Sequence, residues 1–591
     1  MRVVTWCACL ALCPGLVAGQ VAVASEDTAT IAPGSGDAID RARALQADFE
    51  RSRERYFPLT FASSGGECDE IVGRLCTWYG EGEWVPTPEP EEVRELRAEL
   101  LLGLDAIQGL VPRDEWVLGQ RVWYRGEGGD WAAALATARR CGAQAWWCAA
   151  LEGLALYGLQ RYAAAEAAFE RALSEMDPEL ALEWRVPERG VDTEARRILG
   201  TGVTAADGSL DLLLDRLWQL SDPLYLVEGN DRMTAHFARW TVATLRDGAR
   251  NPYRLRWGRD LEELTVRHGW EVGWERTPGS MPGSAYGVTG HKQQEGRDYL
   301  PGGRVLADPT AAPSSDLVAG RVRPRSLYTP PYAPVLLPMD AQLAIFPRGD
   351  TFVVVATHFL PADTTYHAEH DHPRPWMDAG DQVGMPDEIA LFAVPIDGGA
   401  PVSVRRNGLS TGALMIEVPA GAWLLSAESW SPAQRRAGRL RLGLERPPAA
   451  ADVAHLSDVL LLERSERAPA SLVEALPYAL PAPEIAAHDG LAVAWEVSGL
   501  GFRDESLRFE VVVERTDRGV VRRLGEFLGL STRPATVALS WEEPAPDLSG
   551  PVFRHLDLAL PPLDPGVYSV TLTLSTPGRE DVVSRRAFRV R

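Results

Sequence analysis

The side chains best suited to metal chemistry gather in one short stretch of this 591-residue chain, YHAEHDHPRPWMDAGD, residues 366–381. Four of the ten histidines, His358, His367, His370 and His372, lie within this stretch or just before it. Zinc binds nitrogen, oxygen or sulfur ligands at about 2 Å, and alternate residues of an extended segment point the same way. His367, His370 and His372 are therefore a candidate site for zinc or another transition metal.

The same loop has a plainer interpretation, a solvated connection between two strands. It has no HExxH pattern and no pair of histidines at helical spacing. The sequence also has no nucleophile elbow, phosphate-binding loop, dinucleotide-binding glycine pattern or EF-hand pattern. We therefore nominate no catalytic residue, and a metal-dependent hydrolase or metal-binding protein stays the alternative to a binding protein.

The N-terminus and the cysteines predict export. Residues 1–24 combine a positive charge, an apolar run and small residues near the end, a pattern typical of a secretory signal peptide. The remaining chain keeps four cysteines, Cys68, Cys76, Cys141 and Cys148, an even number that permits disulfides in an oxidising compartment. We expect a periplasmic or extracellular location in a bacterium.

The pairing of these cysteines is open at the level of sequence. A helix over the stretch CDEIVGRLCTWYG would separate Cys68 from Cys76 by about 12 Å, too far for a disulfide. We therefore expect cross-pairing, in which two facing helices are joined by both bonds. A zinc site on the four thiolates is the alternative, although no CxxC pair is present.

The elements that would position these groups change character along the chain. Apolar residues recur at helical spacing from Asp37 to about Gly269, as in SLDLLLDRLWQL. After about residue 337 short apolar runs bounded by turn residues predict strands. The sequence therefore predicts a multidomain protein, with an all-α helical-repeat front half followed by two antiparallel β-sandwich domains.

Composition also predicts where the segments begin and end. The expected segments are a signal peptide (1–24), a disulfide-containing helical domain (25–204), a second helical segment (205–276), a Pro- and Gly-rich linker (277–336), a β-sandwich (337–446), a linker (447–482) and an immunoglobulin- or fibronectin-like β-sandwich (483–591).

The stretch GLALYGLQRYAAAEAAFERALSEMDP, residues 153–178, resembles a tetratricopeptide repeat. The residues that match its pattern are Gly153, Tyr162, Ala165, Phe169 and Ala172. GGDWAAALATARR, residues 128–140, matches the same turn and second helix, with Trp131 in the place of Tyr162. The resemblance implies a stack of helices that binds a protein or peptide on its concave face. The many tryptophans of this region are either core residues or the lining of an aromatic groove.

Two further stretches, SDPLYLVEGNDRMTAHFARWTVATLRDG (221–248) and RWGRDLEELTVRHG (256–269), resemble the GWxTD domain of exported bacterial proteins of unassigned function. The residues that match its motif are Asn230, Asp231, His236, Trp257, Asp260, Arg267 and Gly269. Arg256 and Arg259 stand where the family has glycine and threonine. The resemblance extends through the later strands and implies no known activity.

Structural roles are available for several of these motif residues. Asn230 is placed to cap the helix that follows it, and Gly269 is placed to end the next helix. The functional alternative is a polar site built from His236, Asp260 and Arg267.

Net charge limits the class of partner. The chain carries a formal charge of −22, which repels polyanions and argues against a nucleic acid. After residue 24 no segment approaches the roughly 18 uncharged apolar residues that span a bilayer. We expect an exported soluble scaffold that binds a protein or peptide through its helical repeats, with glycan binding by the last sandwich as a further possibility.

Overall fold

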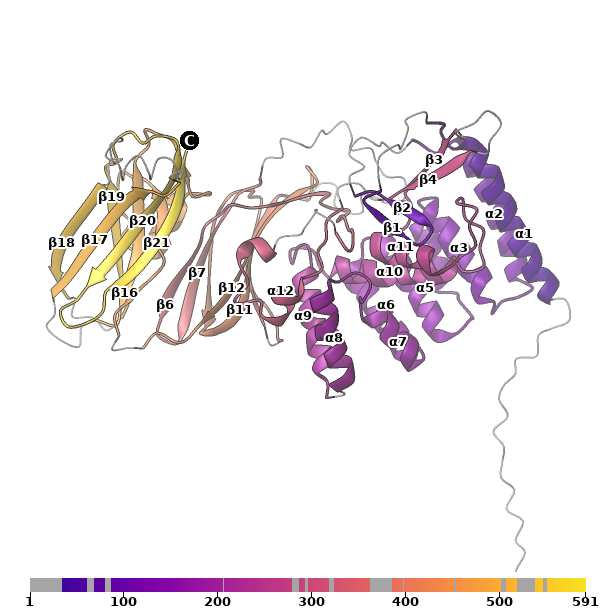
Figure 1. Cartoon of the computed structure of the whole chain (residues 1–591), viewed down its shortest axis with the longest axis horizontal. Helices are drawn as coiled ribbons and strands as arrows, with labels where there is room; N and C mark the ends of the chain where they lie inside the picture. The colour runs from indigo at the N-terminus through magenta and orange to yellow at the C-terminus, as the bar shows by residue number, and fades with distance from the viewer. Residues whose placement is uncertain are drawn as a thin grey trace, which may run out of the picture.

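The computed structural model describes residues 35–60, 68–79, 87–205, 207–278, 286–292, 296–317, 324–361, 385–396, 398–450, 453–500, 506–517, 537–545 and 550–591. Within these ranges the chain forms a row of layers, with helices at one end and two β-sandwiches beside them (Figure 1). The predicted fold class is confirmed. None of the helices in the described ranges combines the length and apolar character needed to cross a bilayer.

The described front half consists mainly of helices, with two small hairpins among them. The helices are α1 (Ser35–Arg53), α2 (Glu91–Gln108), α3 (Glu115–Glu127), α4 (Trp131–Ala138), α5 (Ala145–Gly158), α6 (Tyr162–Glu175), α7 (Pro178–Arg185), α8 (Thr193–Ala205), α9 (Ser209–Ser221), α10 (Asp231–Leu245) and α11 (Arg259–His268). The hairpins are β1 (Glu70–Val72) with β2 (Leu75–Thr77), and β3 (Gly273–Thr277) with β4 (Gly287–His291).

Small residues set how closely consecutive helices approach. Helix α5 packs on α6, and a Cβ added to Gly153 would lie 2.6 Å from the Phe169 ring. The absence of a side chain at Gly153 therefore lets this ring lie directly on α5. Phe169 and the neighbouring Ala165 and Ala172 are buried, as the sequence pattern predicts.

Helix α10 packs against these helices. It contacts α3, α5 and α6, and almost all of its side chains are buried. Gln120 of α3 donates a hydrogen bond to the Leu245 carbonyl at 2.6 Å, and the rings of Phe169 and Phe237 are 5.5 Å apart. The surface of α3 and α5 that a repeat stack would offer to a partner is therefore occupied by the chain's own helix.

The first sandwich pairs a three-stranded sheet, ordered β10–β7–β6, with a five-stranded sheet, ordered β5–β12–β11–β8–β9. Its strands are β5 (Val335–Pro338), β6 (Leu343–Arg348), β7 (Thr351–His358), β8 (Glu388–Pro395), β9 (Val402–Asn407), β10 (Gly412–Pro419), β11 (Gly421–Ser431) and β12 (Arg436–Arg446). Neighbouring strands are antiparallel except β5 and β12, which are parallel.

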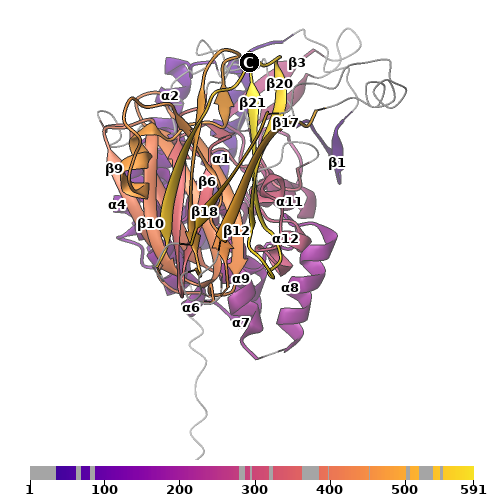
Figure 2. The ribbon, with the colours of Figure 1, turned by 90° about the vertical axis from the view of Figure 1, so that its left-hand side faces the viewer.

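The second sandwich has one sheet in which β16 pairs with β13, β14 and β19, and a second sheet ordered β15–β21–β20–β17–β18. Its strands are β13 (His455–Leu456), β14 (Leu460–Glu463), β15 (Glu484–Ile485), β16 (Leu491–Ser498), β17 (Ser506–Arg515), β18 (Val537–Pro544), β19 (Val552–Leu558), β20 (Gly566–Ser575) and β21 (Val582–Val590). Viewed from this end of the molecule, the strands of both sandwiches run in roughly the same direction (Figure 2).

Strand β7, TFVVVATH, is buried along almost its whole length because both of its faces are covered. On one face Val354 contributes to the core of the first sandwich. On the other face Val353 packs in a cluster with Leu460 and Leu462 of the second sandwich. A strand buried on both faces reads as a continuous apolar run instead of an alternation, as this one does.

Described residues of the two segments predicted to be linkers contribute to the core. Within residues 277–336, Tyr328 and Tyr332 are buried in the cluster that joins the helices to the five-stranded sheet, and α12 (Gly303–Ala307) packs on α8 and α9. Within residues 447–482, β14 pairs with β16 of the second sandwich. Both segments lack a regular apolar period in the sequence, yet apolar side chains of their described residues pack against neighbouring layers.

Both disulfides are local, so the prediction of cross-pairing is wrong. Cys68 bonds Cys76, and the two Cα atoms are 5.5 Å apart. The segment between them is a β-hairpin and not a helix, with Ile71 opposite Cys76. Because a hairpin reverses the chain, it brings together two cysteines that a helix would hold about 12 Å apart.

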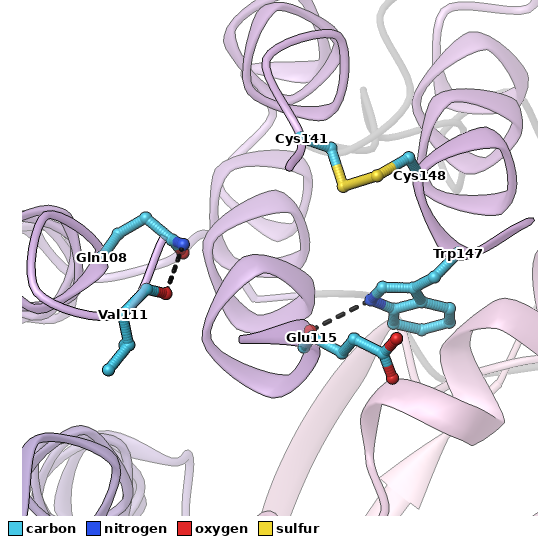
Figure 3. Close-up of a disulfide and its surroundings, with 6 residues drawn as sticks. All are labelled: Gln108, Val111, Glu115, Cys141, Trp147 and Cys148. Atoms are coloured by element: carbon cyan, nitrogen blue, oxygen red, sulfur yellow. Dashed lines mark hydrogen bonds between the residues drawn. A yellow bond between two sulfur atoms is a disulfide. The ribbon is translucent and has the colours of Figure 1, made fainter. Parts of the chain in front are cut away.

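The second disulfide joins Cys141 to Cys148, again with Cα atoms 5.5 Å apart. Cys141 precedes α5 and Cys148 lies in its first turn, so the bond ties the connection after α4 to the start of α5 (Figure 3). Beside it, the Trp147 indole donates a hydrogen bond to the Glu115 carbonyl at 3.0 Å. Two disulfides of this kind indicate an oxidising environment.

Candidate functional site

Two of the residues that match the GWxTD motif mark helix boundaries. The Asn230 side chain caps α10 by accepting a hydrogen bond from the Met233 amide at 2.8 Å, and it donates to the Trp218 carbonyl at 2.7 Å. Gly269 ends α11 with a φ of +84°, and its amide donates to the Thr265 carbonyl. Both predicted boundary roles are confirmed.

Two charged motif residues hold the hairpin β1–β2 against α11. Arg74, in the hairpin turn, donates from Nε and Nη2 to the Asp260 carboxylate at 2.6 and 2.7 Å. Arg267 donates to both carboxylate oxygens of Glu70 at 2.8 Å. The hydrogen bonds from Arg74 hold the pKa of Asp260 well below its usual range. Asp260 and Arg267 therefore act as docking groups for a disulfide-closed hairpin.

An apolar contact accompanies these ion pairs. Val72 and Leu75 of the hairpin pack on Leu261 and Leu264 of α11, and the motif residue Trp257 packs against the same cluster. Arg267 is almost fully buried in this arrangement, with a side-chain exposure of 2%. The hairpin is thus fixed by apolar burial and by two paired contacts at once.

The His236 side chain has a different partner from those of Asp260 and Arg267, and a polar site built from the three residues stays a prediction. Among the described residues, His236 shares no hydrogen bond with Asp260 or Arg267. Its Nε2 lies 2.7 Å from the Trp184 carbonyl, and because a carbonyl only accepts, Nε2 carries the proton. Burial and the nearby charge of Arg232 lower the pKa of His236 to about 3, so the ring is neutral.

Asp231, the first residue of α10, is fully buried. Tyr328 donates its hydroxyl to Asp231 Oδ2 at 2.6 Å. Burial raises the pKa of the Asp231 carboxyl to about 7, and the hydrogen bond from Tyr328 opposes that rise. Asp231 therefore belongs to the buried polar layer between α10 and the segment that carries Tyr328.

The histidines predicted to bind metal, His367, His370 and His372, lie outside the described residues. Their neighbour His358 is buried, with Nε2 2.8 Å from the Ala390 carbonyl, and burial lowers its pKa to about 4. In the ranges that the structure describes, no group of three or more His, Cys, Asp or Glu side chains is arranged to hold a metal ion. The metal site stays a prediction.

A cavity of about 820 Å³ opens between α7, α8, α10 and α11. Its apolar lining includes Leu199, Val203 and Trp240, and its polar lining includes Arg232, His236 and several other arginine and glutamate side chains. The volume is in the range of sites that enclose a small molecule or a few residues of a peptide. This cavity is the candidate functional site.

Sequence reasoning found only His236 among the residues that line this cavity from α10. Arg232, His236 and Trp240 follow one another at intervals of four, so they lie on one face of the helix. That spacing was visible in the sequence. The function of this face could not be inferred from the sequence, because the helices opposite it, α7, α8 and α11, are brought there only by the fold.

A second cavity, of about 360 Å³, is lined by Tyr56, Phe57, Trp123, Trp131, Trp270 and Trp274. At its wall Arg97 is paired with Glu89 at 2.5 Å, and Arg53 is paired with Glu127 at 2.8 Å. Several tryptophans of the helical region therefore line a cavity in addition to filling the core.

Comparison with known proteins adds little. No family model matches the chain, and no curated protein matches it. Among solved structures, the chain is similar to a transglutaminase of the red sea bream at 11% sequence identity, over 43% of this chain and 31% of that one, with a TM-score of 0.13. The match spans about a third of the transglutaminase, and a TM-score of this size carries no conclusion about fold or activity.

Proposed function

We propose that this protein is an exported binding protein of the GWxTD type, and that it takes a segment of a protein or peptide into the cavity between α7, α8, α10 and α11. The observation that carries the proposal is the cavity itself. About 820 Å³ with mixed apolar and charged lining suits a few residues of a polypeptide, which presents both kinds of group.

The position of α10 favours this cavity over the inner face of the helical stack. Repeat stacks usually bind partners on that face, but here α10 contacts α3, α5 and α6 there. A partner would have to displace a helix whose side chains are almost all buried. Binding at the cavity needs no such displacement.

The two disulfides and the N-terminal sequence support export. Disulfides persist in periplasmic and extracellular proteins and are rare in the cytosol. Residues 1–24 have the pattern of a signal peptide. Together they favour a partner that is itself outside the cytosol.

The test is a peptide selection on the chain from residue 25 onward, followed by fluorescence anisotropy with the selected peptide. Gly200 of α8 lines the cavity, and a Cβ added there meets no atom within 4 Å. Gly200→Trp therefore places an indole at the cavity without displacing the core, and we expect it to weaken binding by at least about tenfold. Thr201→Trp, at an exposed neighbour that does not line the cavity, is the matched control and should bind as the wild type does.

Two results would contradict the proposal. If no peptide is selected, the protein is not a peptide-binding protein. If the selected peptide binds Gly200→Trp and the wild type equally well, the cavity is not its site.

A further inference from the structure

Arg232 is buried in the cavity wall with donors left over. Its side chain is among the largest fully buried ones, with an exposure of 1%. Nη2 donates to the Ser326 hydroxyl at 2.5 Å, but Nε and Nη1 have no hydrogen-bond partner among the residues that the structure describes. Buried polar groups are almost always paired, so unpaired donors on a buried cation call for a specific explanation.

Asp298 and Asp231, the acids whose charges act on Arg232, do not supply the missing acceptors. The Asp298 carboxylate accepts hydrogen bonds from the backbone amides of Leu300, Arg325 and Ser326, at 3.2, 2.8 and 3.3 Å. Asp231 is bonded to Tyr328. Both acids stabilise the Arg232 charge through space, yet neither accepts a hydrogen bond from its Nε or Nη1.

The aromatic contact of Arg232 also leaves these donors free. The guanidinium carbon lies 5.7 Å from the centre of the Tyr328 ring. A cation over a ring face is stabilised by the ring, but its in-plane N–H groups stay available. The same ring lies 5.9 Å from Arg239, whose donors are bonded to backbone carbonyls at 2.5 Å (Leu327) and 2.8 Å (Arg267).

The charged side chains that line the cavity include both arginines and glutamates. The arginines in its lining are Arg189, Arg196, Arg232, Arg259 and Arg325, and the acids are Glu179, Glu183, Glu188 and Glu263. Part of this charge is already paired: Arg189 bonds Glu262 at 2.6 Å, and Glu263 accepts from Arg267 at 3.1 Å. Among the described residues of this wall, Arg232 is thus a buried charged side chain with unpaired hydrogen-bond donors, and its charge is positive.

His236 adds an acceptor to the same wall. Because its Nε2 donates to the Trp184 carbonyl, Nδ1 is unprotonated and able to accept a hydrogen bond. Its position four residues after Arg232 places it on the same face of α10. A ligand with an acidic group and a nearby N–H, as in a peptide, matches both side chains.

We propose that Arg232 binds a carboxylate of the ligand in this cavity, either an acidic side chain or the C-terminal carboxylate of a peptide. The inference rests on the proposed function and deepens it, since it names the chemical group that the site recognises. Nε and Nη1 point to different sides of the guanidinium, so a carboxylate that accepts from either of them supplies one of the partners that the described protein lacks. Charge-assisted hydrogen bonds of this kind are among the stronger ones in proteins.

The test uses trifluoroacetate as the probe, observed by ¹⁹F NMR with the full chain from residue 25. We expect saturable line broadening with the wild type. Arg232→Gln should weaken binding by about tenfold or more, Arg232→Lys should weaken it less, and Arg139→Gln should leave it unchanged. Arg139 is the control because it is paired with Glu152 and lies outside the cavity. Near-ultraviolet circular dichroism checks that each variant is folded.

Competition identifies the source of the carboxylate. N-acetyl-diglycine carries a C-terminal carboxylate, and the α-amide of N-acetyl-glutamate carries only a side-chain carboxylate. The better competitor names the group, and the neutral amide of N-acetyl-diglycine should not compete. If inorganic phosphate displaces the probe better than either carboxylate, the inference of a carboxylate site is wrong.

Further outcomes separate the inference from the proposed function. Equal broadening with the wild type and Arg232→Gln, or none with the wild type, overturns the inference. If Arg232→Gln does not fold, Gly200→Trp serves as the second variant, and unchanged broadening there overturns it too. A selected peptide that binds Arg232→Gln normally would keep the function and reject the inference, whereas probe binding without any peptide binding would reject the function.

Discussion

Replacing Arg267 with methionine should release the hairpin β1–β2 from α11. The Arg267 side chain is 2% exposed and donates two hydrogen bonds to Glu70, one to Glu263 and one to the Arg325 carbonyl. Removing one partner of a buried ion pair costs about 3–5 kcal/mol. Glu70 keeps 24% of its side chain exposed, so hydration offsets part of this cost. We expect the free energy of hairpin opening to fall by about 2–3 kcal/mol.

Amide hydrogen exchange followed by mass spectrometry measures that opening directly. A loss of about 2–3 kcal/mol corresponds to exchange that is about 30- to 150-fold faster. The acceleration should be confined to peptides that cover residues 69–77, because the disulfide and the contact of Arg74 with Asp260 remain. Peptides from either sandwich should exchange at the wild-type rate.

A double-mutant cycle decides whether the ion pair is the cause. Arg267→Met, Glu70→Gln and the double variant should show a coupling free energy of about 1–3 kcal/mol. Arg139→Met breaks a pair in which the arginine is 58% exposed, so it should change exchange by at most a few fold. Additive effects of the two single changes, or no more acceleration than Arg139→Met causes, would refute the reasoning.

Replacing both Cys68 and Cys76 with serine should speed amide hydrogen exchange in the same hairpin, because the disulfide that closes this short loop stabilises it by about 2–3 kcal/mol. Unchanged exchange would show that the contacts with α11 alone hold the hairpin. Replacing Gln342 with leucine removes three hydrogen bonds, two with Leu461 of β14 and one with Leu480. We expect the free energy of opening between the sandwiches to fall by about 2–4 kcal/mol, so that proteolysis there becomes faster. Cleavage at the wild-type rate would contradict this. Burial raises the folded pKa of Asp231 from 3.8 to about 7, so the folded state holds a proton that the unfolded state has released between about pH 4 and 7. This carboxyl therefore lowers stability as pH rises through that window, and Asp231→Asn should raise the melting temperature more at pH 8 than at pH 5; a pH-independent difference would sink this interpretation.

Several features of the fold could be predicted because they depend on neighbouring residues alone. The helical period ends and the strand pattern begins where the structure changes from helices to sandwiches. Asn230 caps α10, and Gly269 ends α11 with a positive φ, because side-chain capping and left-handed backbone are properties of a few consecutive residues.

The disulfide pairing could not be predicted in the same way. The spacing of Cys68 and Cys76 fits a helix face as well as it fits a hairpin, and only the second geometry brings the sulfurs together. The roles of Asp260 and Arg267 were hidden for a related reason. Their partners, Arg74 and Glu70, are almost two hundred residues away in the chain.

By itself the sequence determined the order of helical and strand-rich regions, the capping residues, the cysteines available for disulfides and the acidic overall charge. Each of these follows from composition or from contacts over a few residues. Only the tertiary structure decided that α10 packs on α3, α5 and α6, that described residues of the expected linkers belong to the core, and that Arg232 is buried beside a cavity. These depend on contacts between segments far apart in the chain, and burial removes the water that would otherwise satisfy a charge such as Arg232.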